Sequence, residues 1–274
     1  MAFFSHLVDG PLSGPRIGVV RIEGTISDTK KTMEWIAELE EKPNVHGFLI
    51  RVDSPGGGVV ASQELHDVIK RLAEDRPVVV SMGSVAASGG LMISTGATHI
   101  VANASTLTGS IGVKMEMPNV EKLMRALGLD RNILTSGDLK DAGSPFRTMT
   151  DSERNYFQAI IMELHDQFVT LIAVDRNLPL EAVQSFADGR VFTGATALEL
   201  GIVDSLGGEH AALDVLVRLC RQAQPASPEA EAANDAPYTL IEQPEDTSLL
   251  RELLQSALGI TPPTSMTSPQ FLYE

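Results

Sequence analysis

Short apolar runs alternate along the chain with segments whose apolar residues recur at helical spacing. The runs predict strands at residues 17–22, 47–52, 78–82 and 99–102. The periodic segments predict helices at residues 29–41, 59–74 and 151–176. Because strands and helices alternate, the pattern indicates βαβ units and a largely parallel sheet, and therefore an α/β fold.

The last of these predicted helices has a start signal and an apolar stripe. Thr150 and Glu153 have the spacing of a capping box. Apolar residues then share one helical face, which is typical of core or of a contact between subunits. They are Tyr156, Phe157, Ile160, Ile161, Leu164 and Phe168.

Ser88 is a candidate nucleophile because of where it stands. It follows the strand at 78–82 within a run of small residues, and a helix is expected from residue 87 to residue 95. The amides at the start of a helix have no intrahelical acceptor, so the Gly89 N–H can face a developing negative charge. Taken alone, Ser88 could equally be a helix N-cap.

A glycine loop upstream offers a second amide for the same purpose. Residues 53–58 read Asp-Ser-Pro-Gly-Gly-Gly and follow the predicted strand at 47–52. Glycine permits the close backbone approach that an oxyanion hole requires, and Gly57 is the expected donor. By itself such a loop is usually a turn.

Lys140 is the candidate base for Ser88. A lysine can activate a serine only when it is uncharged, which requires burial or a nearby cation. Residues 77–113 contain no Asp, Glu, Lys or Arg, so the surroundings of Ser88 offer no carboxylate that would keep a lysine charged. Asp138 and Asp141 flank Lys140, and we expect their side chains to point elsewhere. Alone, Lys140 would be read as a solvated loop residue.

In this order and setting, the motifs resemble the signal peptide peptidase A family of bacterial Ser–Lys serine peptidases. The resemblance covers about residues 16 to 208. It rests on the segments 16–26, 54–57, 86–90, 106–113, 136–141 and 187–191. It implies the Clp protease/crotonase-like fold of repeated ββα units, with a single catalytic domain and a C-terminal tail.

The resemblance also implies roles for individual residues. Ser88 is the nucleophile, Lys140 the general base, and the amides of Gly57 and Gly89 form the oxyanion hole. Ser110 is implied to orient the lysine amine, although a turn serine is the plainer interpretation. No cofactor and no metal are expected. The implied substrates are cleaved signal peptides or other unfolded apolar segments, bound by a ring-like homo-oligomer for which we predict an octamer.

The predicted domain boundaries follow from composition and from the extent of the resemblance. Residues 1–15 form an N-terminal extension, 16–222 the peptidase domain, and 223–274 a flexible linker and tail. Within the tail, residues 249–258 predict a short amphipathic helix, and residues 261–274 look extended.

Charge and targeting signals narrow the partners and the location. The net charge is −15, which argues against nucleic acid and against direct attraction to an anionic membrane. No transmembrane segment or signal peptide is visible, so a cytoplasmic or membrane-associated protein is expected. The single cysteine, Cys220, excludes an intrachain disulfide and is expected to be buried.

Other functions remain open at this stage. The glycine spacing at 56–58 loosely matches a dinucleotide fingerprint, which would imply a nicotinamide cofactor. A crotonase-like enzyme acting on acyl-CoA would use similar paired amides, and a non-catalytic ring scaffold would need no nucleophile. His99 is the histidine nearest to Ser88 in sequence and is therefore the spare candidate base. The six histidines lack metal-binding spacing.

Overall fold

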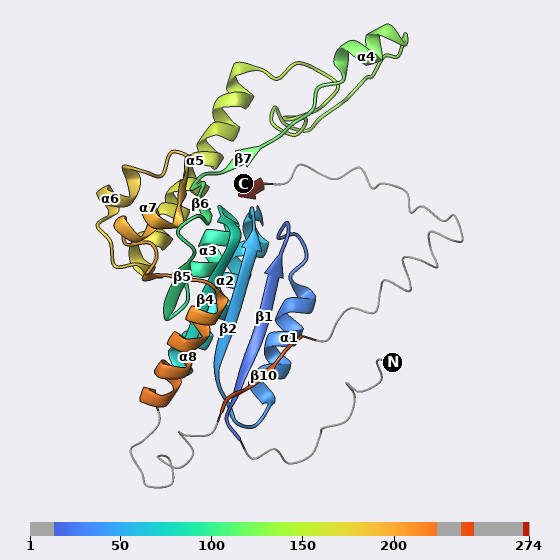
Figure 1. Ribbon diagram of the computed structural model, residues 1–274. Helices are drawn as coiled ribbons and strands as arrows, with labels where there is room; N and C mark the ends of the chain where they lie inside the picture. Colours follow the sequence, from blue (N-terminus) through green and yellow to red (C-terminus); the bar gives the residue numbers. More distant parts are fainter. Residues whose placement is uncertain (1–13, 224–236, 244–270, 274) are drawn as a thin grey trace.

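The computed structural model describes residues 14–223, 237–243 and 271–273 of the chain (Figure 1). The strands in these ranges are β1 (Arg16–Glu23), β2 (Val45–Ser54), β3 (Gly57–Gly58), β4 (Val78–Ala87), β5 (His99–Ala102), β6 (Leu107–Gly109), β7 (Lys114–Met115), β8 (Val191–Thr193), β9 (Ser205–Leu206), β10 (Thr239–Ile241) and β11 (Phe271–Tyr273). The helices are α1 (Lys30–Glu41), α2 (Val59–Asp75), α3 (Gly89–Thr95), α4 (Glu121–Ala126), α5 (Asp151–Asp175), α6 (Leu180–Gln184), α7 (Gly194–Glu199) and α8 (Glu209–Ala223).

The main sheet has the strand order β10-β1-β2-β4-β5-β9, and every pair along this path is parallel. β4 is long enough to pair with β5 through its first half and with β6 through its second half. β8 then adds antiparallel to β6. The predicted parallel α/β sheet is confirmed. β4 lies at its centre, paired with β2 on one side and with β5 and β6 on the other.

Alternate residues of the strands face two different layers. Val20, Ile50 and Val80 lie in register and pack in the large core beneath α1, α2, α3 and α5. Val19 and Val79 point to the other face, where α8 covers them. Helices therefore bury both faces of the sheet, which is why its strands are nearly continuous in apolar residues.

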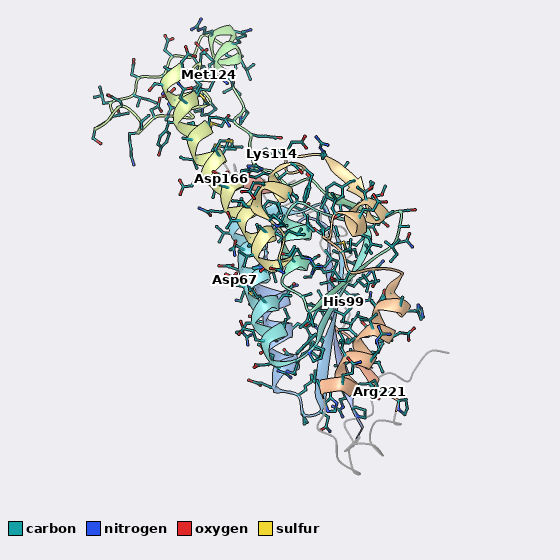
Figure 2. All side chains as sticks on the ribbon, turned by 90° about the vertical axis from the view of Figure 1, so that its left-hand side faces the viewer. Asp67, His99, Lys114, Met124, Asp166 and Arg221 are labelled. Atoms are coloured by element: carbon teal, nitrogen blue, oxygen red, sulfur yellow. The ribbon has the colours of Figure 1, made fainter. Side chains whose placement is uncertain are left out.

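One segment projects away from this body. Residues 116–150, between β7 and α5, include α4 and extend beyond the sheet (Figure 1). Figure 2 shows Met124 of α4 at the far end of this projection, distant from His99 in the sheet. No residue of α4 is buried. We call residues 116–150 the projecting arm.

Most predicted elements are confirmed, with differences at their ends. β4 continues to Ala87 and α3 begins only at Gly89, so strand and helix meet at Ser88. The capping box of Thr150 and Glu153 is present at the start of α5. Residues 239–241 of the predicted tail pair with β1, which the sequence did not indicate. The helix predicted at 249–258 lies outside the described residues.

α5 is long and apolar enough to cross a membrane by length and composition, although such a helix is also found in proteins that do not span one. Its C-terminal half is built into the core through Phe168, Val169, Ile172 and Ala173. Its N-terminal half is largely exposed, and Phe168 alone of the predicted apolar stripe is buried. The exposed part of the stripe favours a contact between subunits over a core position.

Cys220 is buried on α8, where the thiol lies 3.4 Å from the carbonyl oxygen of His46. Burial raises the pKa of this thiol to about 12. Since the thiolate is the reactive form, we predict that Ellman's reagent leaves the native protein unlabelled at pH 8 and labels one thiol per chain in denaturant. Rapid labelling of the native protein, followed by absorbance, would contradict the burial described here.

Candidate active site

Ser88 sits at the sharp junction between β4 and α3. Its backbone has φ 53° and ψ −117°, a conformation that residues other than glycine rarely adopt. Bonds on both sides hold it there. Its N–H donates to the Gly109 carbonyl over 2.8 Å, and its own carbonyl accepts from the Met92 N–H over 2.9 Å. A strained residue fixed in this way is typical of a functional site.

The Ser88 hydroxyl is buried without a hydrogen-bond partner among the described residues. Leaving a buried hydroxyl unpaired costs about 1–3 kcal/mol. Ser88 stands at the N-cap position of α3, but its side chain makes no cap hydrogen bond. The interpretation of Ser88 as a simple N-cap is therefore wrong, and a chemical role for the hydroxyl is favoured.

The glycine loop packs directly against the start of α3. A side chain on Gly89 would place its Cβ 3.3 Å from the Cα of Gly56 and 2.3 Å from the hydroxyl of Ser62. A Cβ on Gly57 would lie 2.0 Å from the carbonyl oxygen of Ile26. The loop is also bonded to Ile26, whose carbonyl accepts from the Gly58 N–H over 2.7 Å. The two predicted oxyanion donors are thus brought onto neighbouring segments beside Ser88.

Ser110 joins the same site from the end of β6. Its backbone also has positive φ, at 52°, and its N–H donates to the Arg190 carbonyl over 2.8 Å. The preceding residue, Gly109, is the one whose carbonyl accepts from the Ser88 N–H. Ser110 therefore directly follows the residue that accepts a hydrogen bond from the backbone of the candidate nucleophile. It is almost fully buried.

Lys140 is placed apart from this group within one chain. It is exposed in a turn of the projecting arm, where its N–H donates to the Gly137 carbonyl over 3.1 Å. Its amine is not bonded to the Ser88 hydroxyl, which has no partner within the described ranges. A single chain gathers Ser88, Gly57, Gly89 and Ser110, and it leaves Lys140 outside.

His99 does not take the place of the lysine. Its Nε2 lies 2.9 Å from the hydroxyl of Ser205 on β9. It therefore bonds a serine other than Ser88. Among the described residues no three His, Cys, Asp or Glu side chains are grouped so that they could hold a metal ion.

A small second sheet lies beside the glycine loop. β11 pairs antiparallel with β3 on one side, matching Tyr273 with Gly57 and Leu272 with Gly58. On its other side it pairs antiparallel with β7, matching Leu272 with Lys114. The gap between β3 and β7 therefore accepts one extended strand next to the candidate oxyanion hole. We call this gap the strand slot.

The far end of α3 is anchored by a buried ionic cluster that the sequence did not reveal. Asp175, at the end of α5, accepts from Thr95 over 3.0 Å, from Lys70 over 2.7 Å and from His66 over 2.6 Å. Burial alone would raise the pKa of Asp175, but the hydrogen bonds of these three groups outweigh it and lower the pKa. The cluster ties α3 to α2 and α5, and so steadies the helix that begins at Ser88. In the sequence, His66 falls within the helix predicted at residues 59–74, but nothing there marks it as buried or as a partner of Asp175.

Comparison with known proteins places the chain in a family. The family model described as "Peptidase family S49" matches residues 70–222, which include Ser88, Ser110 and Lys140. A Synechocystis protein named "Putative protease slr0021" is 43% identical over 196 residues, covering 71% of this chain and 71% of that protein. An Enterococcus faecium protein named "Putative signal peptide peptidase SppA" is 34% identical, covering 74% of this chain and 63% of its own length.

Other relatives are considerably longer than the matched region. "Protease 4" of Haemophilus influenzae is 32% identical over 76% of this chain, but the match covers 35% of that protein. Among solved structures, a point mutant of ClpP1 from Listeria monocytogenes has a TM-score of 0.50 at 20% identity, covering 71% of this chain and 94% of that one. The predicted Clp protease-like fold is confirmed.

The tight packing at Gly57 generates a stability prediction. We expect Gly57→Ala to lower the free energy of unfolding by about 1–3 kcal/mol, because the new Cβ overlaps backbone that cannot yield. The matched control is Gly58→Ala, since a Cβ there meets nothing closer than 3.6 Å. It should be neutral or slightly stabilising. Urea unfolding measures both, and equal stability of the two variants would contradict the described packing.

Proposed function

The chain belongs to peptidase family S49, and we propose that it is a serine endopeptidase in which Ser88 is the nucleophile and Lys140 its general base. The observation that carries this proposal is the buried, unpaired Ser88 hydroxyl, held at a strained strand-to-helix junction against a glycine loop. The grouping of a candidate nucleophile, two candidate oxyanion donors and a neighbouring serine supports acyl transfer as the reaction.

In the proposed mechanism, uncharged Lys140 takes the proton of the Ser88 hydroxyl as its oxygen attacks the substrate carbonyl. The amides of Gly57 and Gly89 stabilise the oxyanion. Lys140 then gives the proton to the leaving amine, and water activated by the same lysine hydrolyses the acyl-enzyme. Ser110 orients the lysine amine toward Ser88. No cofactor takes part.

Assembly completes the site in this proposal. Because Lys140 lies on the projecting arm, the lysine that serves one Ser88 comes from a neighbouring copy. Exposed apolar residues on the arm support such a contact, since patches of this kind mark protein interfaces. They are Leu123, Leu127, Leu129, Ile133, Leu134 and Leu139. A ring-like homo-oligomer satisfies this geometry, and the octamer stays a prediction.

The proposed substrates are unfolded peptides with apolar side chains, such as cleaved signal peptides. The strand slot supports an extended peptide, because it already holds residues 271–273 of this chain, with Leu272 and Tyr273 paired to β3 and Phe271 and Leu272 paired to β7. A pocket of about 370 Å³ next to β7 has a largely apolar part, formed by Ile111, Val113, Ile161 and Met162, beside polar residues such as Gln158 and His165. The apolar part suits an apolar substrate side chain.

The rival functions fit the described residues less well. A dinucleotide would need the glycine loop to be open to a pyrophosphate, but Gly58 is bonded to Ile26 and paired with β11. An acyl-CoA enzyme gains nothing from a buried serine at a strained position. A non-catalytic scaffold has no use for an unpaired buried hydroxyl that costs stability.

Mixing two inactive variants tests the shared site. Ser88→Ala and Lys140→Ala should each lower turnover of dye-labelled casein by a factor on the order of 10⁴ or more. Chains of both variants, co-expressed in equal amounts, should regain about a quarter of wild-type activity, since each site then draws Ser88 and Lys140 from different copies.

The control for this mixture replaces the Lys140→Ala chain by the double variant Ser88→Ala/Lys140→Ala. It supplies no intact Ser88 and should stay inactive. The mixture of the two single variants could also stay inactive although light scattering shows normal assembly. That result would show that Ser88 and Lys140 do not act across copies. Full activity in either variant alone would refute the dyad.

The occupied strand slot generates a second prediction. A chain that lacks residues 271–274 should show a lower KM for an internally quenched apolar peptide and an unchanged kcat, because β11 then no longer competes for the slot. Leu272→Pro should have the same effect, since proline cannot donate a ladder hydrogen bond. The matched control Leu272→Ala keeps the N–H and should retain more of the competition. A KM unchanged by truncation would contradict the proposed binding mode.

A further inference from the structure

Arg147 is the centre of a dense group of hydrogen bonds close to the turn that carries Lys140. Its Nε donates to the Asp141 carboxylate over 2.9 Å, and its Nη2 donates to the Asp141 carbonyl over 2.7 Å. Its Nη1 and Nη2 also bond both carboxylate oxygens of Glu153, at 2.9 and 2.5 Å. All three guanidinium nitrogens are used, so this arginine can adopt only one orientation.

Glu153 anchors this group of hydrogen bonds to α5. It is buried in the first turn of α5, and its carboxylate accepts from the Thr150 N–H over 2.9 Å as part of the capping box. The hydrogen bonds from Arg147, followed by that from the Thr150 backbone, lower the pKa of Glu153 to about 2. The carboxylate is therefore charged at any working pH, and Arg147 is tied to a 25-residue helix.

Asp141 directly follows Lys140 and belongs to the same run of turns. The N–H of Ser144 donates to the Asp141 carbonyl over 3.3 Å, and the N–H of Lys140 donates to Gly137 over 3.1 Å. Arg147 binds that Asp141 carbonyl and the Asp141 carboxylate together. The backbone of the lysine turn is thus attached to α5 through one side chain.

Of the two carboxylates that flank Lys140 in the sequence, that of Asp141 is engaged by arginines. Asp141 faces Arg147 and, at 4.0 Å, Arg131. Asp138 and Asp141 both line an open pocket of about 660 Å³, which Lys140 does not line. Glu153 is saturated by Arg147 and the cap. A free carboxylate beside Lys140 would favour its ammonium form, which cannot accept a proton.

From these contacts we infer that Arg147 is a positioning residue for the general base: it holds the Asp141 carboxylate away from the Lys140 amine and fixes the lysine turn to α5. This inference rests on the proposed function. Arg147 touches neither substrate nor the reacting atoms. It acts on the protonation state and the location of Lys140 through Asp141.

The test compares the pH dependence of kcat/KM, measured with an internally quenched apolar peptide, across four variants. Arg147→Gln releases Asp141, so the acidic limb should move to higher pH by about one unit, with about a tenfold loss at a pH on that limb. Arg147→Lys still neutralises Asp141 and should keep the limb in place. Asp141→Asn should also keep it. The double variant Arg147→Gln/Asp141→Asn should return the limb toward the wild-type pH.

Arg125→Gln is the matched control, because Arg125 also pairs with a carboxylate on the projecting arm, that of Glu121, without contacting the lysine turn. It should leave the whole profile unchanged. Light scattering and thermal unfolding identify any variant that fails to fold or assemble. If Arg147→Gln does not fold or assemble, Arg147→Lys and Asp141→Asn are compared with wild type instead. A displaced acidic limb in Arg147→Lys then overturns the inference.

A purely structural role for Arg147 predicts a different pattern. The limb would not move in Arg147→Gln, and the double variant would be no better than Arg147→Gln alone; either result overturns the inference. Lys140→Ala separates this failure from that of the proposed function. Retained activity in Lys140→Ala overturns both, whereas lost activity together with an unmoved limb in Arg147→Gln overturns only the role of Arg147.

Discussion

The contact between two glycine segments is the constraint on which the rest of the structure depends. Gly89 can begin α3 beside Gly56 only because it has no side chain, since a Cβ there would lie 2.3 Å from the Ser62 hydroxyl and 3.3 Å from the Gly56 Cα, and Gly57 fits under Ile26 for the same reason. This contact leaves Ser88 in a backbone conformation with positive φ, with its hydroxyl buried. The free-energy cost of that strain and of the unpaired hydroxyl is met by the core around β4, which is buried on both faces.

In the proposed account, the chain separates the two halves of its chemistry. The rigid body holds the nucleophile and the oxyanion donors, and the projecting arm holds the base. A solitary chain would then carry no working dyad, so hydrolysis would begin only on assembly. In this proposal, the coupling would protect other proteins from an isolated protomer. It also explains why the arm exposes leucines while its lysine turn is fixed firmly by Arg147.

The sequence predicted the elements that local pattern controls. The strands β1, β2 and β5 and the helices α1, α2 and α5 were expected close to their observed ends, because each has its own apolar periodicity and α5 has its own cap. β10 and β11 were not expected as sheet members. Each has three residues and is defined by partners far away in the chain, and local pattern does not encode such partners.

The candidate site was predictable to a similar extent. Ser88, Gly57 and Gly89 lie at strand ends that a parallel sheet brings together, so the pattern suggested their grouping, whereas Ser110 was expected only from the family resemblance. The position of Lys140 did not follow, because the arm around it has little regular structure and few buried residues. Asp141 looked like an obstacle in the sequence. Its pairing with Arg147, six residues later, resolves that difficulty and needed coordinates to be seen.

The most direct test of the central claim is labelling by a fluorophosphonate probe, which reacts only with an activated serine, followed by mass spectrometry of the modified peptide. The account predicts that the assembled wild-type protein is labelled at Ser88 and that Lys140→Ala abolishes the label while assembly remains intact. Labelling at another serine, or labelling of Ser88 that is equally fast in Lys140→Ala, would contradict it.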